Sequence, residues 1–83
     1  MPYYVYILHS TKTNKYYTGS CEDIEIRLAQ HNSGRSKSTR AGAPWIMLYY
    51  EQYETRIAAV NRENEIKSKK SRKYIEWLIS PVG

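Results

Sequence analysis

Two tyrosine-rich segments near the start of the chain, separated by a short polar break, constrain the fold more than any other feature. Residues 3–9 (YYVYILH) have the composition of a buried strand, and their nearly continuous apolar character indicates a central strand covered on both faces. Asn14 suits a turn within the polar break, and residues 15–20 (KYYTGS) follow as a second strand. The sequence therefore predicts a β-hairpin with a tyrosine near the middle of each strand.

A helix and a third strand are expected after the hairpin. Asp23 can cap a helix that runs to Asn32, and Gly34 suits the left-handed position beyond its end. Residues 33–44 form a long polar loop. Residues 45–53 (WIMLYYEQY) follow a proline and have strand composition.

Two more helices complete the predicted architecture. Thr55 can cap a helix from Arg56 to about Lys70, and Ser71 can cap a last helix over 72–79, with Pro81 ending it and Trp77 closing the core beneath it. We therefore expect an α+β fold: a small, mainly antiparallel three-stranded sheet flanked by helices. At 83 residues, the chain has room for one domain, which we expect to span residues 1–83.

Four reactive side chains are drawn together by the hairpin and the first helix. Arg27 and His31 lie one helical turn apart, where they can reach back over Tyr6 and Tyr17. A guanidinium can hold a phosphate oxygen, and an imidazole titrates near neutral pH. A phenol, with a reference pKa of about 10, acts as a base only if nearby cations favour the phenolate or if it relays a proton.

Glu63 stands on an otherwise apolar stripe of the second helix. Its spacing from Ala59 and Ile66 is that of one helix face, and an unpartnered carboxylate is costly to bury there. Most helical glutamates are solvated, but the apolar company, taken together with a match to a known family motif, favours a metal ligand. Mg²⁺ accepts one or two carboxylates together with water and substrate oxygens, so we expect one divalent ion, Mg²⁺ or Mn²⁺.

The net charge of +5 favours a polyanionic partner. Basic residues gather in the polar loop and at the end of the second helix, and the candidates for binding nucleic acid are Arg35, Lys37, Arg40, Lys67, Lys69 and Lys70. A flexible solvated loop, and cations that stabilise a helix terminus, are the alternative interpretations.

The chain resembles the GIY-YIG nuclease superfamily, above all its small bacterial members that consist of this domain alone. The resemblance runs from Tyr3 to about Ile79, and the segments that carry it are Tyr4-Val5-Tyr6, Tyr17-Thr18-Gly19, Arg27, His31, Arg62-Glu63 and Ile66-Lys67. The chain departs from the superfamily pattern at Tyr4, where a glycine is usual, and at Ser20, near which a lysine often occurs.

The resemblance implies a metal-dependent endonuclease that hydrolyses phosphodiester bonds of DNA, in repair or recombination. It implies that Tyr6 helps to activate water, that Tyr17 orients the water or the phosphate, and that Glu63 binds the metal; His31 is the second candidate for the base. Gly19 either permits a close approach or simply ends a strand. Specificity would come from the domain's own loops or from a protein partner.

Two rival functions remain: a nucleic-acid-binding module without catalysis that keeps the basic face, and a plain interaction domain whose tyrosines are core. The single cysteine, Cys21, excludes an internal disulfide and a cysteine-based metal site. No apolar run reaches the ~20 residues of a membrane span, and no signal peptide is evident, so we expect a cytoplasmic protein.

Overall fold

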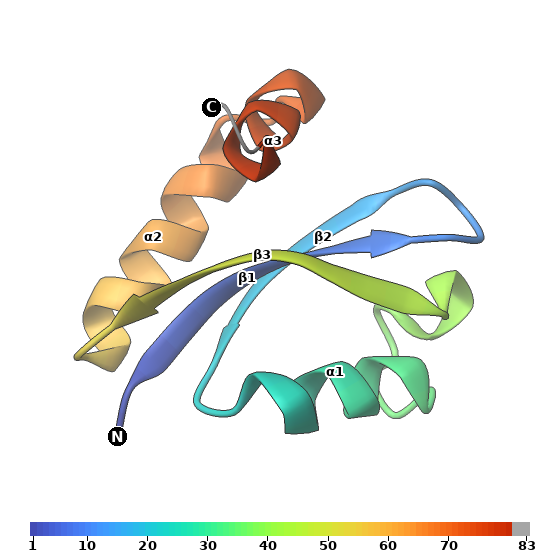
Figure 1. The fold of residues 1–83 in the computed structure, drawn as a ribbon, viewed down its shortest axis with the longest axis horizontal. Coiled ribbons are helices and arrows are strands. Elements are labelled where there is room, and N and C mark those ends of the chain that lie inside the picture. Colours follow the sequence, from blue (N-terminus) through green and yellow to red (C-terminus); the bar gives the residue numbers. More distant parts are fainter. Residues whose placement is uncertain (81–83) are drawn as a thin grey trace.

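The computed structural model describes residues 1–80 and has the expected α+β architecture (Figure 1). Its elements are β1 (Tyr3–Ser10), β2 (Tyr16–Cys21), α1 (Ile24–Asn32), the short 3₁₀ helix η1 (Arg40–Gly42), β3 (Trp45–Tyr53), α2 (Arg56–Ser68) and α3 (Arg72–Ile79). The sheet is antiparallel with strand order β2-β1-β3. Figure 1 shows α1 on one side of the sheet and α2 and α3 on the other.

The hairpin strand β1 is the centre of the molecule, as its apolar composition predicts. Residues 5–8 are each at most 2% exposed, so both faces of the strand are covered. Tyr6 and Leu8 pack toward α1 together with Trp45, whereas Val5 packs toward α2 against Ala59. The two sides of the sheet therefore carry separate apolar clusters.

A bulge lets strand β3 contribute to both clusters. The pairing with β1 shifts between Ile7 and Leu8, whose partners are Tyr49 and Met47, and this leaves Leu48 as the extra residue. As a result, Trp45 and Met47 pack on the α1 side, while residues 49–53 present alternate side chains to α2 and α3.

Each of α1, α2 and α3 begins at its predicted cap. The side chains of Asp23, Thr55 and Ser71 accept hydrogen bonds from the backbone amides of residues 26, 58 and 74. Gly34 has a φ of +83°, the left-handed conformation expected beyond α1. Pro81, the predicted end of α3, lies outside the described residues.

Trp77 does not close the core, so that prediction was wrong. Its side chain is 58% exposed, and its ring lies 5.9 Å from that of Tyr74 at the helix surface. Ile75 and Leu78 pack inward instead. Within residues 1–80, no helix has both the length and the apolar character that crossing a bilayer requires.

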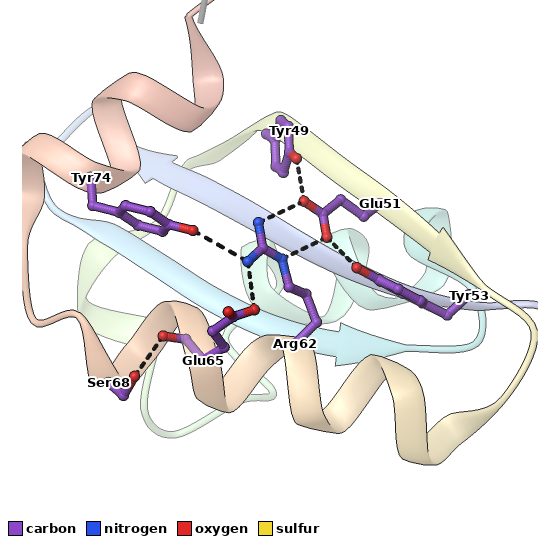
Figure 2. Close-up of polar contacts among 7 residues, drawn as sticks. All are labelled: Tyr49, Glu51, Tyr53, Arg62, Glu65, Ser68 and Tyr74. Atoms are coloured by element: carbon purple, nitrogen blue, oxygen red, sulfur yellow. Dashed lines mark hydrogen bonds and ion pairs between the residues drawn. The ribbon is translucent and has the colours of Figure 1, made fainter.

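A polar network fastens α2 and α3 to β3 (Figure 2). Nε and Nη2 of Arg62 donate to the two carboxylate oxygens of Glu51 at 2.9 and 3.1 Å, and Tyr49 and Tyr53 also donate to this carboxylate. Nη1 of Arg62 donates to the Tyr74 hydroxyl at 3.2 Å. Burial alone would raise the pKa of Glu51, but the hydrogen bonds from Arg62 and the two tyrosines lower it below its ordinary value.

Candidate active site

The phenol of Tyr6 lies over Gly19 of the neighbouring edge strand. The two residues are paired in register, and a Cβ atom on Gly19 would stand 2.5 Å from the Tyr6 hydroxyl oxygen and 2.7 Å from Cζ. Of the two interpretations of this glycine, the structure therefore supports close approach. The missing side chain lets the hydroxyl of a central-strand tyrosine reach toward the edge of the sheet.

Tyr6 and His31 form the centre of a buried hydrogen-bonded chain. The Tyr6 hydroxyl lies 2.9 Å from Nε2 of His31, and Nδ1 lies 2.6 Å from the Thr39 hydroxyl. The Thr39 hydroxyl also lies 3.5 Å from the carbonyl oxygen of Ser36, to which it can donate. In the neutral tautomer with the proton on Nδ1, Thr39 accepts from Nδ1–H and Tyr6 donates to Nε2; in the other tautomer, both bonds run the opposite way.

Burial shifts both groups toward their neutral forms. It lowers the pKa of His31, which is only 1% exposed, and the positive charge of Arg27 lowers it further. Burial also raises the pKa of Tyr6 far above that of a free phenol; the charges of Tyr17, Cys21 and Glu63 add to this, and only Arg27 opposes it. Tyr6 is therefore a neutral phenol hydrogen-bonded to a neutral imidazole at neutral pH, and not a resident phenolate.

Tyr17 and Arg27 flank this pair. The Tyr17 ring lies 5.0 Å from the His31 ring and 6.4 Å from the Tyr6 ring, measured between centroids. Arg27 is exposed and lines a cleft of about 280 Å³ that also includes Ser20 and Arg56. No ion pair occupies Arg27 among the side chains of residues 1–80, so its guanidinium is free to meet an anion entering the cleft.

Glu63 reaches the same edge strand from the opposite side of the sheet. Its carboxylate accepts from the Ser20 hydroxyl at 2.6 Å and from Nζ of Lys67 at 2.5 Å, and its side chain is 15% exposed. Ser20 follows Gly19 and faces the other way, because side chains alternate along a strand with a rise of about 3.3 Å. The Tyr6 hydroxyl and the carboxylate thus lie beside consecutive residues of β2, on its two faces, and the site straddles that strand.

The oxygen donors at Glu63 suit a hard cation such as Mg²⁺. Within residues 1–80, no three His, Cys, Asp or Glu side chains form a group that could hold a metal ion by themselves. A site of this kind matches an ion that keeps most of its water and binds substrate oxygens. Lys67 occupies Oε2 and the Ser20 hydroxyl donates to Oε1, so an ion would have to displace Lys67 or share Oε1 with Ser20.

The predicted nucleic-acid contacts divide into three places. Arg35, Lys37 and Arg40 are exposed on the loop whose Thr39 holds His31. Lys67 and Lys70 line a groove of about 470 Å³ between β2 and the α2–α3 corner. Lys69 turns away from that groove and lies 5.4 Å over the Tyr74 ring.

Sequence reasoning missed three partners of the site. Thr39 is buried within a loop that the sequence predicts to be solvated. Ser20 was noted only as a departure from a pattern, and Lys67 was not expected to pair with Glu63. Only the i, i+4 spacing of Glu63 and Lys67 was visible in the sequence as a signal for such a pair.

The structure is a small α+β domain of the GIY-YIG class. Its three-stranded sheet carries the paired hairpin tyrosines, and the helix that follows carries the arginine and the histidine. The GIY-YIG catalytic domain family matches residues 2–75, and the chain belongs to this family. This match confirms the resemblance to the GIY-YIG superfamily that the motif segments indicate.

Relatives and a solved structure agree with this assignment. A UPF0213 protein of Haloquadratum walsbyi is 42% identical over 67 residues, which cover 80% of this chain and 74% of that protein. A UPF0213 protein from Staphylococcus saprophyticus is 36% identical over 77 residues, which cover 92% of this chain and 93% of that protein. The solution NMR structure of a UPF0213 protein from Bacillus halodurans matches with a TM-score of 0.58 and 34% identity, over 95% of this chain and 83% of that one.

Proposed function

We propose that this protein is a metal-dependent endonuclease that hydrolyses phosphodiester bonds of DNA and acts in repair or recombination. Membership of a family of catalytic domains supports a nuclease. The observation that carries the proposal is the hydrogen bond between Tyr6 and a neutral His31, beside Tyr17 and next to a glutamate held at the same strand. Such a set supplies a proton acceptor and a metal ligand around one edge of the sheet, and the nearby Arg27 adds a positive charge.

In this proposal, Tyr6 relays a proton and His31 receives it. A free phenolate at Tyr6 is costly because burial raises the pKa of this phenol. Tyr6 therefore gives its proton to Nε2 of His31 as it takes one from the attacking water, and no phenolate accumulates. Thr39 would accept from Nδ1–H and thereby leave Nε2 ready to accept the proton.

Arg27 and Glu63 act on the phosphate from the two sides of β2. Arg27 would bind a non-bridging oxygen and balance the charge that builds on the phosphate. Glu63 would hold a divalent ion, Mg²⁺ or Mn²⁺, which when bound stabilises the charge on the leaving oxygen. Tyr17, in contact with the His31 ring, would orient the water or the phosphate.

The test is cleavage of supercoiled plasmid and of branched DNA with Mg²⁺ or Mn²⁺, comparing wild type with Glu63→Gln. A metal contribution of several kcal/mol corresponds to at least about a hundredfold in rate. Glu54→Gln is the matched control, because this glutamate is exposed at the start of α2. The proposal fails if wild type cuts no substrate, or if Glu63→Gln cuts as fast as Glu54→Gln.

A nucleic-acid-binding module without catalysis is the second candidate, and the ion pair between Lys67 and Glu63 favours it. A carboxylate already satisfied by an ammonium and a hydroxyl has no need of a metal. In that case, wild type and Glu63→Gln bind DNA alike, with an affinity that falls steeply with salt, and neither cuts.

A further inference from the structure

A second concave surface adjoins the candidate active site and is not used by the mechanism above. This groove, about 470 Å³ in volume, lies between the first half of β2 and the corner joining α2 to α3. Tyr17 and Lys67 belong both to its wall and to the active site, so the two are continuous. Its volume is that of a pocket for one small molecule or one nucleotide, which is too small for a duplex.

The rim of the groove is positively charged. Four of its lining residues are cationic and none is acidic, all within the described residues 1–80; the four are Lys15, Lys67, Lys70 and Arg72. They come from the hairpin turn, from α2, from the link and from α3, so they surround the groove. Lys67 is paired with Glu63 and Arg72 with Glu76, so of these four it is Lys15 and Lys70 whose charge no ion pair within residues 1–80 offsets. A phosphate that leaves the active site on this side would meet them in succession.

The floor of the groove is apolar. Ile66, only 1% exposed, and the half-buried Ile75 lie between the basic residues, and the ring of Tyr16 forms part of the wall. The backbone of a duplex presents only sugar and phosphate, since its bases are stacked inside. An apolar floor under a cationic rim instead fits a nucleotide whose base is unpaired and free to leave the stack.

The walls of the groove are fixed in place without a ligand. The Arg72 guanidinium stacks 4.6 Å from the centroid of the Tyr16 ring and donates to the carbonyl of Asn14 at 2.8 Å, which fastens α3 to the hairpin turn. Lys70 has a φ of +47°, a left-handed conformation that glycine adopts at far lower cost. A lysine at this position is unfavourable for the fold, and such strain is typical of functional positions.

We propose that this groove binds an unpaired nucleotide next to the scissile phosphate, with Lys15 and Lys70 on its phosphate and the base on the apolar floor. The proposal rests on the proposed function and narrows its substrate to DNA that carries a single-stranded segment at the cut, such as a flap, an overhang or a branch.

The test is binding of labelled oligonucleotides to the full chain, with a chelator present so that no cleavage occurs. The probes are a blunt duplex, the same duplex with unpaired nucleotides at its 3′ or 5′ end, and that overhang with abasic sites in place of the bases. At least one overhang should bind about fivefold or more tightly than the blunt duplex, and the abasic version should lose most of this gain.

Substitutions in the protein test the same contacts. Lys15→Gln and Lys70→Gly should each weaken binding of the overhang about threefold or more and reduce its salt dependence by about 0.7 in log–log slope. Lys12→Gln is the matched control, because Lys12 lies in the same turn as Lys15 but outside the groove. Lys70→Gly also relieves the left-handed strain, so weaker binding cannot be attributed to unfolding.

Equal binding of blunt, overhanging and abasic probes, or equal effects of Lys15→Gln and Lys12→Gln, would overturn the groove proposal and leave the nuclease proposal to its own cleavage test. If wild type binds no DNA at all, both proposals fall. If cleavage fails while the overhang preference and the Lys15 and Lys70 effects hold, the groove belongs to a binding module.

Discussion

The Tyr6 hydroxyl and Nε2 of His31 lie 2.9 Å apart in the interior, although 25 residues separate them in the chain. Burial favours the neutral form of each, by lowering the pKa of His31 and raising that of Tyr6. The bond therefore joins two uncharged groups and couples the protonation of His31 to both folding and the proposed reaction.

Acid should destabilise the protein through His31. The pKa of the folded residue lies below the ordinary 6.5, so as the pH falls through 6.5, the unfolded chain binds a proton at this residue first. The free energy of unfolding then decreases until the lower folded pKa is passed. Urea unfolding of wild type and His31→Gln between pH 7.5 and 5.5 measures this decrease, which the variant should lack. If the free energies of unfolding of the two proteins differ by the same amount across that range, the prediction is wrong.

Replacing Gly19 with alanine should displace Tyr6. The new methyl group would overlap the phenol hydroxyl, and overpacking of this kind costs about 1–3 kcal/mol. Cleavage should fall together with stability, because the bond to His31 is disturbed. Gly34→Ala serves as the control: its strain at a φ of +83° also costs about 1–2 kcal/mol, but it lies away from Tyr6. Loss of cleavage in both variants alike would argue against a specific role for Gly19.

Arg62→Met should lower the free energy of unfolding by about 2–3 kcal/mol. This is less than the loss of about 3–5 kcal/mol for breaking a fully buried ion pair, because both partners are partly exposed. The substitution leaves the Glu51 carboxylate with two tyrosine donors and no positive charge. Adding Glu51→Gln should recover part of the loss, and a double-mutant cycle measured by urea unfolding would show the coupling. Additive effects would mean that the pair contributes little.

Ser20→Ala should raise the metal concentration needed for cleavage about tenfold or more, as the loss of a hydrogen bond to a metal ligand commonly does. The reason is that the Ser20 hydroxyl holds one oxygen of Glu63. Titration of cleavage with Mn²⁺ measures the effect. Ser68→Ala, at the exposed end of α2, is the control, and the same metal dependence in both variants would contradict the assignment.

Local signals predicted most of the fold. Side chains that cap helices act on amides three residues away, so Asp23, Thr55 and Ser71 could be assigned from sequence alone. The central position of β1 followed from its unbroken apolar run. Trp77 was misplaced because a helix of eight residues has one inward face, and Ile75 and Leu78 already fill it.

The parts that escaped prediction depend on pairing between distant segments. The bulge in β3 changes which apolar cluster each residue joins. Inward and outward side chains still alternate along the whole strand, so no break in a two-residue period marks the position of the bulge. The contact of Thr39 with His31 also depends on how a polar loop returns to the sheet. The motif singles out Tyr6 and His31, but the loop contact that holds the His31 ring is visible only in the structure.

The position of β1 has a consequence for synthesis on the ribosome. β1 is made before the other two strands and lies in the middle of the sheet, so one of its edges has no partner until residues 45–53 have been translated. A nascent chain that holds only the hairpin exposes an apolar strand with open backbone groups, which is the form that invites association with other chains. Completion of β3 should therefore mark the point at which the growing chain becomes protected from aggregation.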